Sequence, residues 1–262
     1  MSALPLYPPT RPQSIGEVLD SAFQILRRAL VRSIPYGVLI VIAGELANIH
    51  DLVLGHPLRG FARSDPVWWA WYVCGLMLTL LLWGALLIHQ SELAQGRVSN
   101  VGQELRIAAT RLPVLLGVFI LSMLALALGL VLLIVPGLYL MVPFAFTFPI
   151  VLLRRVGAIE ALRFSVRLVI GNWWRTMLIL SVALLVSLAF YTVAPLAAAI
   201  VLALTRVSDV AVISAVTSVA LVAMGAVSLP FTSAVLLATY GELLVRREGA
   251  DLERRIAAAA ES

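Results

Sequence analysis

The longest charge-free stretch of the sequence, residues 112–153, limits what the chain can fold into. It contains 42 residues without Asp, Glu, Lys or Arg. As one helix it would measure about 63 Å, roughly twice the hydrocarbon thickness of a bilayer. The stretch must therefore fold back on itself. Pro136-Gly137 is the predicted reversal, because Pro removes a backbone donor and Gly permits a turn.

Four further apolar stretches are long enough to cross a bilayer. The first is interrupted only by Glu45, and the four cover residues 33–49, 66–90, 176–205 and 210–241. The whole chain is 61% apolar and only 13% charged, whereas a soluble domain is about half apolar and about a quarter charged. We therefore expect an all-α integral membrane protein with six transmembrane helices.

The arginines predict the orientation of these crossings. All 19 basic residues are Arg, and 16 of them fall on one predicted side of the membrane, with only Arg59, Arg63 and Arg206 on the other. Because positive residues accumulate on the cytoplasmic side, both termini are expected there. The net charge of +5 would then face anionic lipid headgroups and not nucleic acid.

A mixed segment precedes each odd-numbered crossing, and the three segments share a pattern. Ser14 and Glu17 form a predicted capping box, and the equivalent segments begin at Asn100 and around Glu160. Each has Glu or Gln, then Leu at +2, a small residue at +5, and Leu or Val at +9, which share one helical face. The pattern predicts three repeats of an amphipathic helix and two crossings, over residues 14–98, 99–156 and 157–245, followed by a short basic tail, 246–262.

Two alternatives stay open for these segments. Any amphipathic helix ahead of a membrane span would carry a similar pattern, so the repeat is one of two readings. If they are amphipathic helices, they either lie flat on the cytoplasmic membrane surface or pack together as a cap. The small residues Ala22, Ala108 and Ser165 would permit close packing.

Three stretches resemble a bacterial membrane-protein family labelled the glycerophosphodiester phosphodiesterase membrane domain. They are RPQSIGEVLDSAF (11–23), IVPGLYL (134–140) and EALRFSVRLVIGNWW (160–174), of which the last is the most specific. The resemblance implies a six-span protein of the bacterial inner membrane and carries over no catalytic residues. In two-domain members a separate soluble domain performs the phosphodiesterase reaction, and we do not expect that activity here.

The residues that usually perform chemistry are sparse. Without Lys there is no Schiff-base or phosphate-loop lysine, and the lone Cys74 excludes an intrachain disulfide. The histidines at 50, 56 and 89 are too far apart in the predicted topology to share a metal. Only His89, with Ser91 and Glu92, lies near a candidate nucleophile and acid, and these neighbours face different ways on a helix. We expect no catalytic set, metal or cofactor.

Two groups of polar residues are candidate binding sites. Arg154, Arg155, Arg163 and Arg167 lie close together in sequence on the predicted inner side and could hold a phospholipid headgroup, or simply set the topology. Glu45 and Asn48, three residues apart near the predicted outer end of the first crossing, are either an interfacial polar pair or a proton or cation site.

The function expected from these features is that of a non-enzymatic protein. It would organise lipid, anionic above all, or a partner membrane protein at the cytoplasmic face. The alternative is a small transporter or permease subunit, which six crossings and several prolines within them would suit. Few polar residues lie within the crossings, which argues against a solute pathway. An enzyme acting on lipids is the third hypothesis, and it lacks an acid, base or metal set.

The arginine distribution gives the first testable prediction. A reporter that is active only in the periplasm, fused after Ser262, should stay inactive in cells, because the C-terminus is expected in the cytoplasm. The same reporter inserted between the first two crossings should be active. Activity of the C-terminal fusion would contradict the six-crossing topology.

Overall fold

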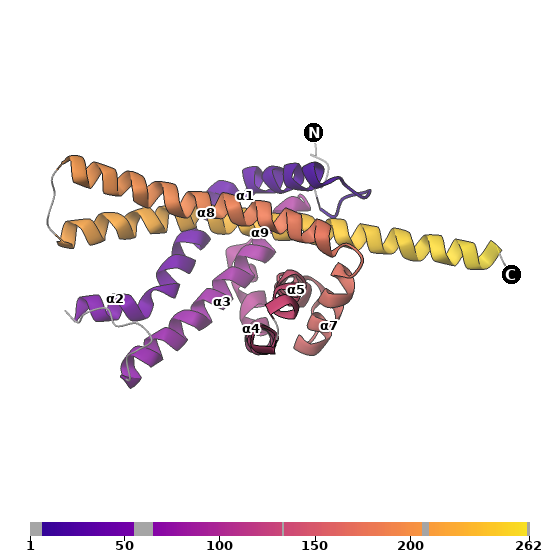
Figure 1. Ribbon diagram of the computed structural model, residues 1–262, viewed down its shortest axis with the longest axis horizontal. Helices are drawn as coiled ribbons and strands as arrows, with labels where there is room; N and C mark the ends of the chain where they lie inside the picture. The colour runs from indigo at the N-terminus through magenta and orange to yellow at the C-terminus, as the bar shows by residue number, and fades with distance from the viewer. Residues whose placement is uncertain (1–6, 55–64, 133, 206–209, 261–262) are drawn as a thin grey trace.

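The computed structural model describes residues 7–54, 65–132, 134–205 and 210–260 of the chain. Within these ranges the chain is all-α (Figure 1). The helices are α1 (Ile15–Gly44), α2 (Leu46–Val53), α3 (Pro66–Ala94), α4 (Val101–Leu132), α5 (Ile134–Phe144), α6 (Thr147–Arg154), α7 (Ala158–Val169), α8 (Trp173–Leu204) and α9 (Val210–Ala260).

The helices have the lengths and hydropathy of a membrane protein. Over the described residues, four are long and apolar enough to cross a bilayer: α3, α4, α8 and residues 215–249 of α9. A fifth candidate is α1 with α2, which meet at a bend of 61°. In place of the fourth predicted crossing, the second half of residues 112–153, the chain forms α5 and α6, whose apolar run, Tyr139–Arg154, is shorter than a span. The count of six therefore stays a prediction.

The charge-free stretch 112–153 does fold back, although not at the predicted dipeptide. Helix α4 ends at Leu132 and α5 begins at Ile134, so the reversal precedes Pro136-Gly137. Pro136 lies in the first turn of α5, where a backbone N–H has no intrahelical partner and its loss is tolerated. Gly137 serves close packing instead, because a Cβ there would lie 2.7 Å from Leu130 Cδ2 on α4.

The predicted amphipathic segments are all helical, but only the third is a separate helix. Helix α1 continues through residues 14–30 into the apolar residues that follow, and α4 does the same beyond residue 111. Pro35 and Pro113 lie inside these helices without ending them. In the third segment Gly171, at φ +90°, separates α7 from α8. The first two segments therefore continue into the apolar residues that follow as single helices, since no residue there breaks the helix.

The three segments nevertheless bury equivalent positions. The small residues Ala22, Ala108 and Ser165 are each 0% exposed. Helix α1 packs on α9 and α3, α4 packs on α3 and α5, and α7 packs on α5 and α6. The shared stripe is thus covered by protein. The burial of these small residues favours packing against other helices over an arrangement in which the stripe faces lipid, and the threefold repeat stays a prediction.

Small residues allow the longest helices to approach closely. A Cβ on Gly37 of α1 would lie 2.8 Å from the Cα atom of Ala226 on α9. Gly75 of α3 faces the backbone carbonyl of Ala43 on α1 in the same way. Small residues at helix contacts are typical of membrane bundles, where dispersion and not the hydrophobic effect drives association.

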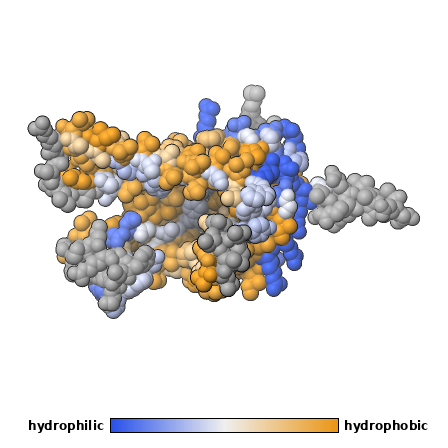
Figure 2. Space-filling view, in the orientation of Figure 1, coloured by the Kyte–Doolittle hydropathy of each residue, from blue (hydrophilic) through white to orange (hydrophobic). Residues whose placement is uncertain are grey.

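The surface of the molecule is polarised. Figure 2 shows hydrophobic residues over most of the visible face and hydrophilic residues gathered towards one end. In the same orientation the hydrophobic region at the upper left is formed by the α8–α9 hairpin of Figure 1. The hydrophilic end is where the chain begins and where α9 emerges from the bundle.

The Gly37 contact predicts a packing defect. Gly37→Ala should lower the unfolding midpoint in detergent, because the new methyl meets backbone and costs about 1–3 kcal/mol of stability. Gly117→Ala on α4 is the matched control, since its Cβ would lie 3.7 Å from the Ala158 Cβ, an ordinary contact. Equal midpoints for both variants would contradict the close packing of α1 on α9.

Candidate functional site

A cavity of about 340 Å³ lies between the ends of α3, α6 and α9. Three arginines line it, two from the end of α6 and one that follows α3, and we call it the arginine pocket. Tyr7 from the N-terminal segment and Tyr240 from α9 add hydroxyls. The full lining is Tyr7, Ile88, Ser91, Glu92, Gln95, Arg97, Ile107, Leu152, Leu153, Arg154, Arg155, Tyr240 and Leu244.

The pocket carries an excess of positive charge. Its only carboxylate is that of Glu92, which lies 3.6 Å from the Arg97 guanidinium. The Arg154 guanidinium lies 4.0 Å above the centre of the Phe164 ring, a cation–π contact that leaves its charge uncompensated. In the described part of the chain neither Arg154 nor Arg155 has an acidic partner, so the two together give the cavity the character of an anion site.

Arg155 adopts a backbone conformation that arginine rarely takes. It closes α6 at φ 57° and ψ 35°, in the left-handed region. This costs about 1–2 kcal/mol in a residue with a Cβ. Gly96, which closely follows α3, also adopts a left-handed backbone conformation, at φ +75°, but glycine has no Cβ and does so without this cost. Because strain of this kind collects at functional sites, the arginine side chain at 155 is an independent pointer to the pocket.

Two tyrosines supply neutral donors. Tyr7 and Tyr240 are 7% and 1% exposed. Burial raises the pKa of the Tyr7 hydroxyl well above its ordinary value; Tyr240 adds to the rise and the charge of Arg154 opposes it. The Tyr7 hydroxyl therefore stays protonated and can donate a hydrogen bond beside the arginines.

The pocket also lies where the predicted repeats meet. Helix α3 ends the first predicted unit, α6 the second and α9 the third, and each contributes to the lining. Sequence reasoning named Arg154 and Arg155 but not this junction. The resemblance between the exits Ser91-Glu92-Leu93 and Gly241-Glu242-Leu243 is the signal that could have located it.

The other two candidate arginines lie elsewhere. Arg163 and Arg167 project from α7 and are exposed, and they do not line the pocket. Helix α7 contributes Phe164 near the pocket. The guanidinium groups of Arg154 and Arg247 both lie over the Phe164 ring. All four predicted arginines are exposed, and what separates them is that Arg154 and Arg155 line the pocket whereas Arg163 and Arg167 do not.

A second polar cluster is buried between α1, α3 and α4. His89 and Glu104 are 1% and 2% exposed, and His89 Nδ1 lies 3.0 Å from Glu104 Oε1. The Glu104 carboxylate also accepts hydrogen bonds from the Tyr36 and Ser99 hydroxyls. The sequence neighbours Ser91 and Glu92 make other contacts: Ser91 donates to the Ile88 carbonyl, and Glu92 pairs with Arg97.

The geometry of this cluster does not suit nucleophilic catalysis. A serine–histidine–acid relay needs the hydroxyl on one ring nitrogen and the acid on the other. Here Ser99 Oγ and both Glu104 oxygens lie within 3.2 Å of the same nitrogen, His89 Nδ1. No group of three metal-ligating side chains occurs among the described residues either. The cluster is therefore a structural tie between α3 and α4.

The position of Glu104 in the predicted repeat is the signal that could have revealed the cluster. The equivalent residues in the other two segments are Val18 and Ala161, both buried and apolar. An acid at a position that is apolar in both sister segments indicates a buried polar partner.

Glu45 and Asn48 are brought together at the bend between α1 and α2. Asn48 Nδ2 donates to Glu45 Oε2 at 2.7 Å, and the Glu45 side chain is exposed. The pair lies on the surface of the protein and lines none of the cavities described above or below. The proton or cation site stays a hypothesis with no enclosed geometry behind it.

Two further cavities are mainly apolar. One, of about 670 Å³, lies where α7 gives way to α8 and is lined by residues that include Tyr139, Trp173 and Trp174. The other, of about 210 Å³, lies between α4 and the α5–α6 segment and is lined largely by Phe, Met and Leu. Neither provides the row of polar groups that a solute path requires.

Comparison of the chain with protein-family models, with curated proteins and with solved structures gives no match. The family resemblance in the three sequence stretches therefore stays a resemblance.

The buried cluster yields a stability prediction. Glu104→Ala should destabilise the protein by about 3–5 kcal/mol, because it leaves His89 and the Tyr36 hydroxyl buried without their acceptor. The double variant Glu104→Ala/His89→Ala should lose less than the sum of the single variants in a double-mutant cycle of thermal unfolding. Additive losses would show that the two side chains are not coupled.

Proposed function

We propose that this protein binds the headgroup of an anionic phospholipid in the arginine pocket and has no enzymatic activity. The observation that carries the proposal is the excess positive charge of Arg154 and Arg155 in a small cavity, at the hydrophilic end of a molecule whose long helices suit a membrane. The proposal includes the orientation predicted by the arginine distribution, with the pocket at the cytoplasmic face of a bacterial inner membrane.

The chemistry of the lining fits a phosphate ester. Guanidinium groups bind phosphate oxygens through paired, charge-assisted hydrogen bonds, and arginine is the side chain best suited to that geometry. Gln95, Ser91 and the tyrosine hydroxyls offer donors and acceptors to the polar remainder of a headgroup. A zwitterionic lipid would bring its own cation into an already positive cavity, so the site should favour anionic lipids.

The same lining supports the proposal that the site binds its ligand without turning it over. Arginine is always protonated and cannot act as a general acid or base. The one carboxylate, Glu92, is paired with Arg97. Binding without turnover is the role that these side chains support. It would let the protein hold lipid, or present it to a partner membrane protein, at the inner face.

The pocket predicts a selective loss of lipid binding. The double variant Arg154→Gln/Arg155→Gln should retain about thirtyfold less phosphatidylglycerol in native mass spectrometry of the detergent-purified protein, because the two arginines together contribute about 2 kcal/mol to attraction of an anionic lipid. The double variant Arg163→Gln/Arg167→Gln removes the same charge from the exposed face of α7 and should lose less.

Three results would overturn the proposal. Equal losses in the two double variants would mean that general surface charge binds the lipid. Equal retention of phosphatidylglycerol and phosphatidylcholine by the unaltered protein would mean that the pocket does not select anionic headgroups. Complete displacement of the lipid by inorganic phosphate would identify a free anion as the ligand.

A further inference from the structure

We infer that the N-terminal segment, residues 7–13, is part of the binding site: it forms one wall of the arginine pocket through Tyr7 and is held in place by a buried carboxylate on α9. We call this segment the N-terminal strap. The inference rests on the proposed function, because it assigns a role to residues around the same pocket.

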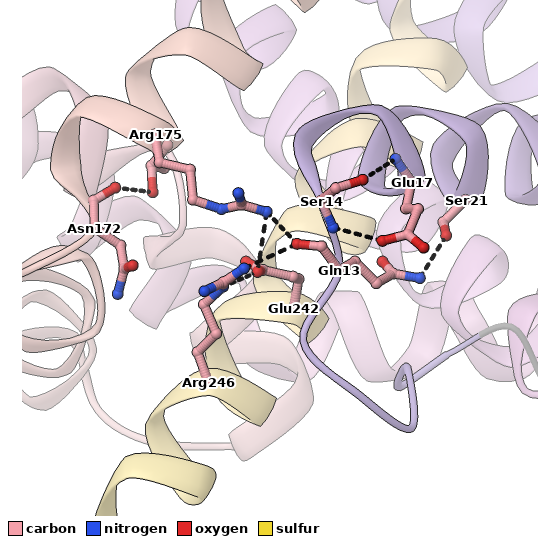
Figure 3. Close-up of polar contacts among 9 residues, drawn as sticks. Gln13, Ser14, Glu17, Ser21, Asn172, Arg175, Glu242 and Arg246 are labelled. Atoms are coloured by element: carbon pink, nitrogen blue, oxygen red, sulfur yellow. Dashed lines mark hydrogen bonds and ion pairs between the residues drawn. The ribbon is translucent and has the colours of Figure 1, made fainter.

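Glu242 is the anchor of the strap. Its side chain is 0% exposed, and a buried carboxylate is stable only when cations and donors surround it. Arg246, one turn along α9, bonds to Glu242 Oε1, and Arg175 Nη2 at the start of α8 lies 3.2 Å from the same oxygen. Figure 3 shows the two guanidinium groups converging on this carboxylate from different helices.

The same two arginines bind the strap. Arg246 Nη2 donates to the backbone carbonyl of Gln13 at 2.9 Å, and Arg175 Nη2 donates to it as well (Figure 3). Each arginine thus bridges Glu242 and the strap. Residues more than 160 positions apart in sequence are tied together at one carbonyl oxygen.

The chain beyond Gln13 is fixed by the start of α1. Gln13 Nε2 donates to Ser21 Oγ at 3.0 Å. Ser14 and Glu17 complete the predicted capping box, with both side chain–backbone bonds formed (Figure 3). One end of the strap is therefore rigid, which limits where its other end can lie.

The other end rests on α9 beside the pocket. A Cβ on Gly241 would lie 2.7 Å from Tyr7 Cε2 and 3.0 Å from Pro9 Cδ, so only glycine leaves room for the strap. Three consecutive residues of α9 therefore position the strap beside the pocket. Tyr240 lines the pocket, Gly241 seats the strap and Glu242 anchors it.

The consequence concerns ligand binding. Tyr7 is buried, lines the pocket and keeps its proton, so its hydroxyl can donate to a bound headgroup while its ring closes that side of the cavity. A strap moved off Gly241 would leave the arginines in place but open the pocket. Affinity should then fall although the charge of the site is unchanged.

Gly241→Ala tests this without altering a charged residue. The new methyl meets the end of the Tyr7 ring, so the ring and not the helix has to move. We expect phosphatidylglycerol retention to fall about tenfold, the loss expected for a hydrogen bond to a charged group. Gly249→Ala, on the same helix with no atom near its Cβ, is the matched control and should retain lipid normally.

Substitutions of Tyr7 provide a second test of the strap. Tyr7→Ala should reduce retention as Gly241→Ala does, and Tyr7→Phe, which keeps the wall and removes the hydroxyl, should fall between Tyr7→Ala and the unaltered protein. Normal retention in both Tyr7→Ala and Gly241→Ala would overturn the role of the strap. If Arg154→Gln/Arg155→Gln still loses lipid in that case, the proposed function stands and only this inference fails.

Discussion

Backbone groups in hydrocarbon have no water to bond, and this constraint shapes the whole molecule. Each long apolar stretch of the described chain is helical, because a helix satisfies its own N–H and C=O groups. Helices in lipid gain little from hiding apolar side chains and associate through close contact. Two glycines supply that close contact. Gly37 of α1 packs against Ala226 of α9, and Gly75 of α3 packs against the Ala43 carbonyl of α1.

Polar groups buried in such a bundle must find one another, and both buried acids near the hydrophilic end do so. Glu104 joins α4 to α3 through His89 and receives the Tyr36 hydroxyl from α1. Glu242 joins α9 to α8 and to the N-terminal strap through two arginines. These clusters tie distant parts of the chain at one end of the bundle, and the arginine pocket lies among the elements that they connect.

The pocket differs from these clusters because its charges are not balanced. Arg154 and Arg155 have no acidic partner in the described part of the chain, and Arg155 takes a strained backbone conformation. Both arginine side chains are exposed, so an anion can reach them from outside the protein. A cavity that leaves positive charge uncompensated next to neutral donors is suited to an anion from outside, and membrane lipid is the anion closest at hand.

The sequence by itself determined the all-α class, the fold-back within residues 112–153 and the starts of the three amphipathic segments, because these follow from helix length, hydropathy and capping residues such as Ser14. It also singled out Arg154 and Arg155. Tertiary structure alone decided that α1 and α4 run on without a break, that His89 pairs with Glu104, and that Tyr7, Gly241 and Glu242 meet. Those contacts depend on how helices distant in sequence pack, and local periodicity carries no information about such partners.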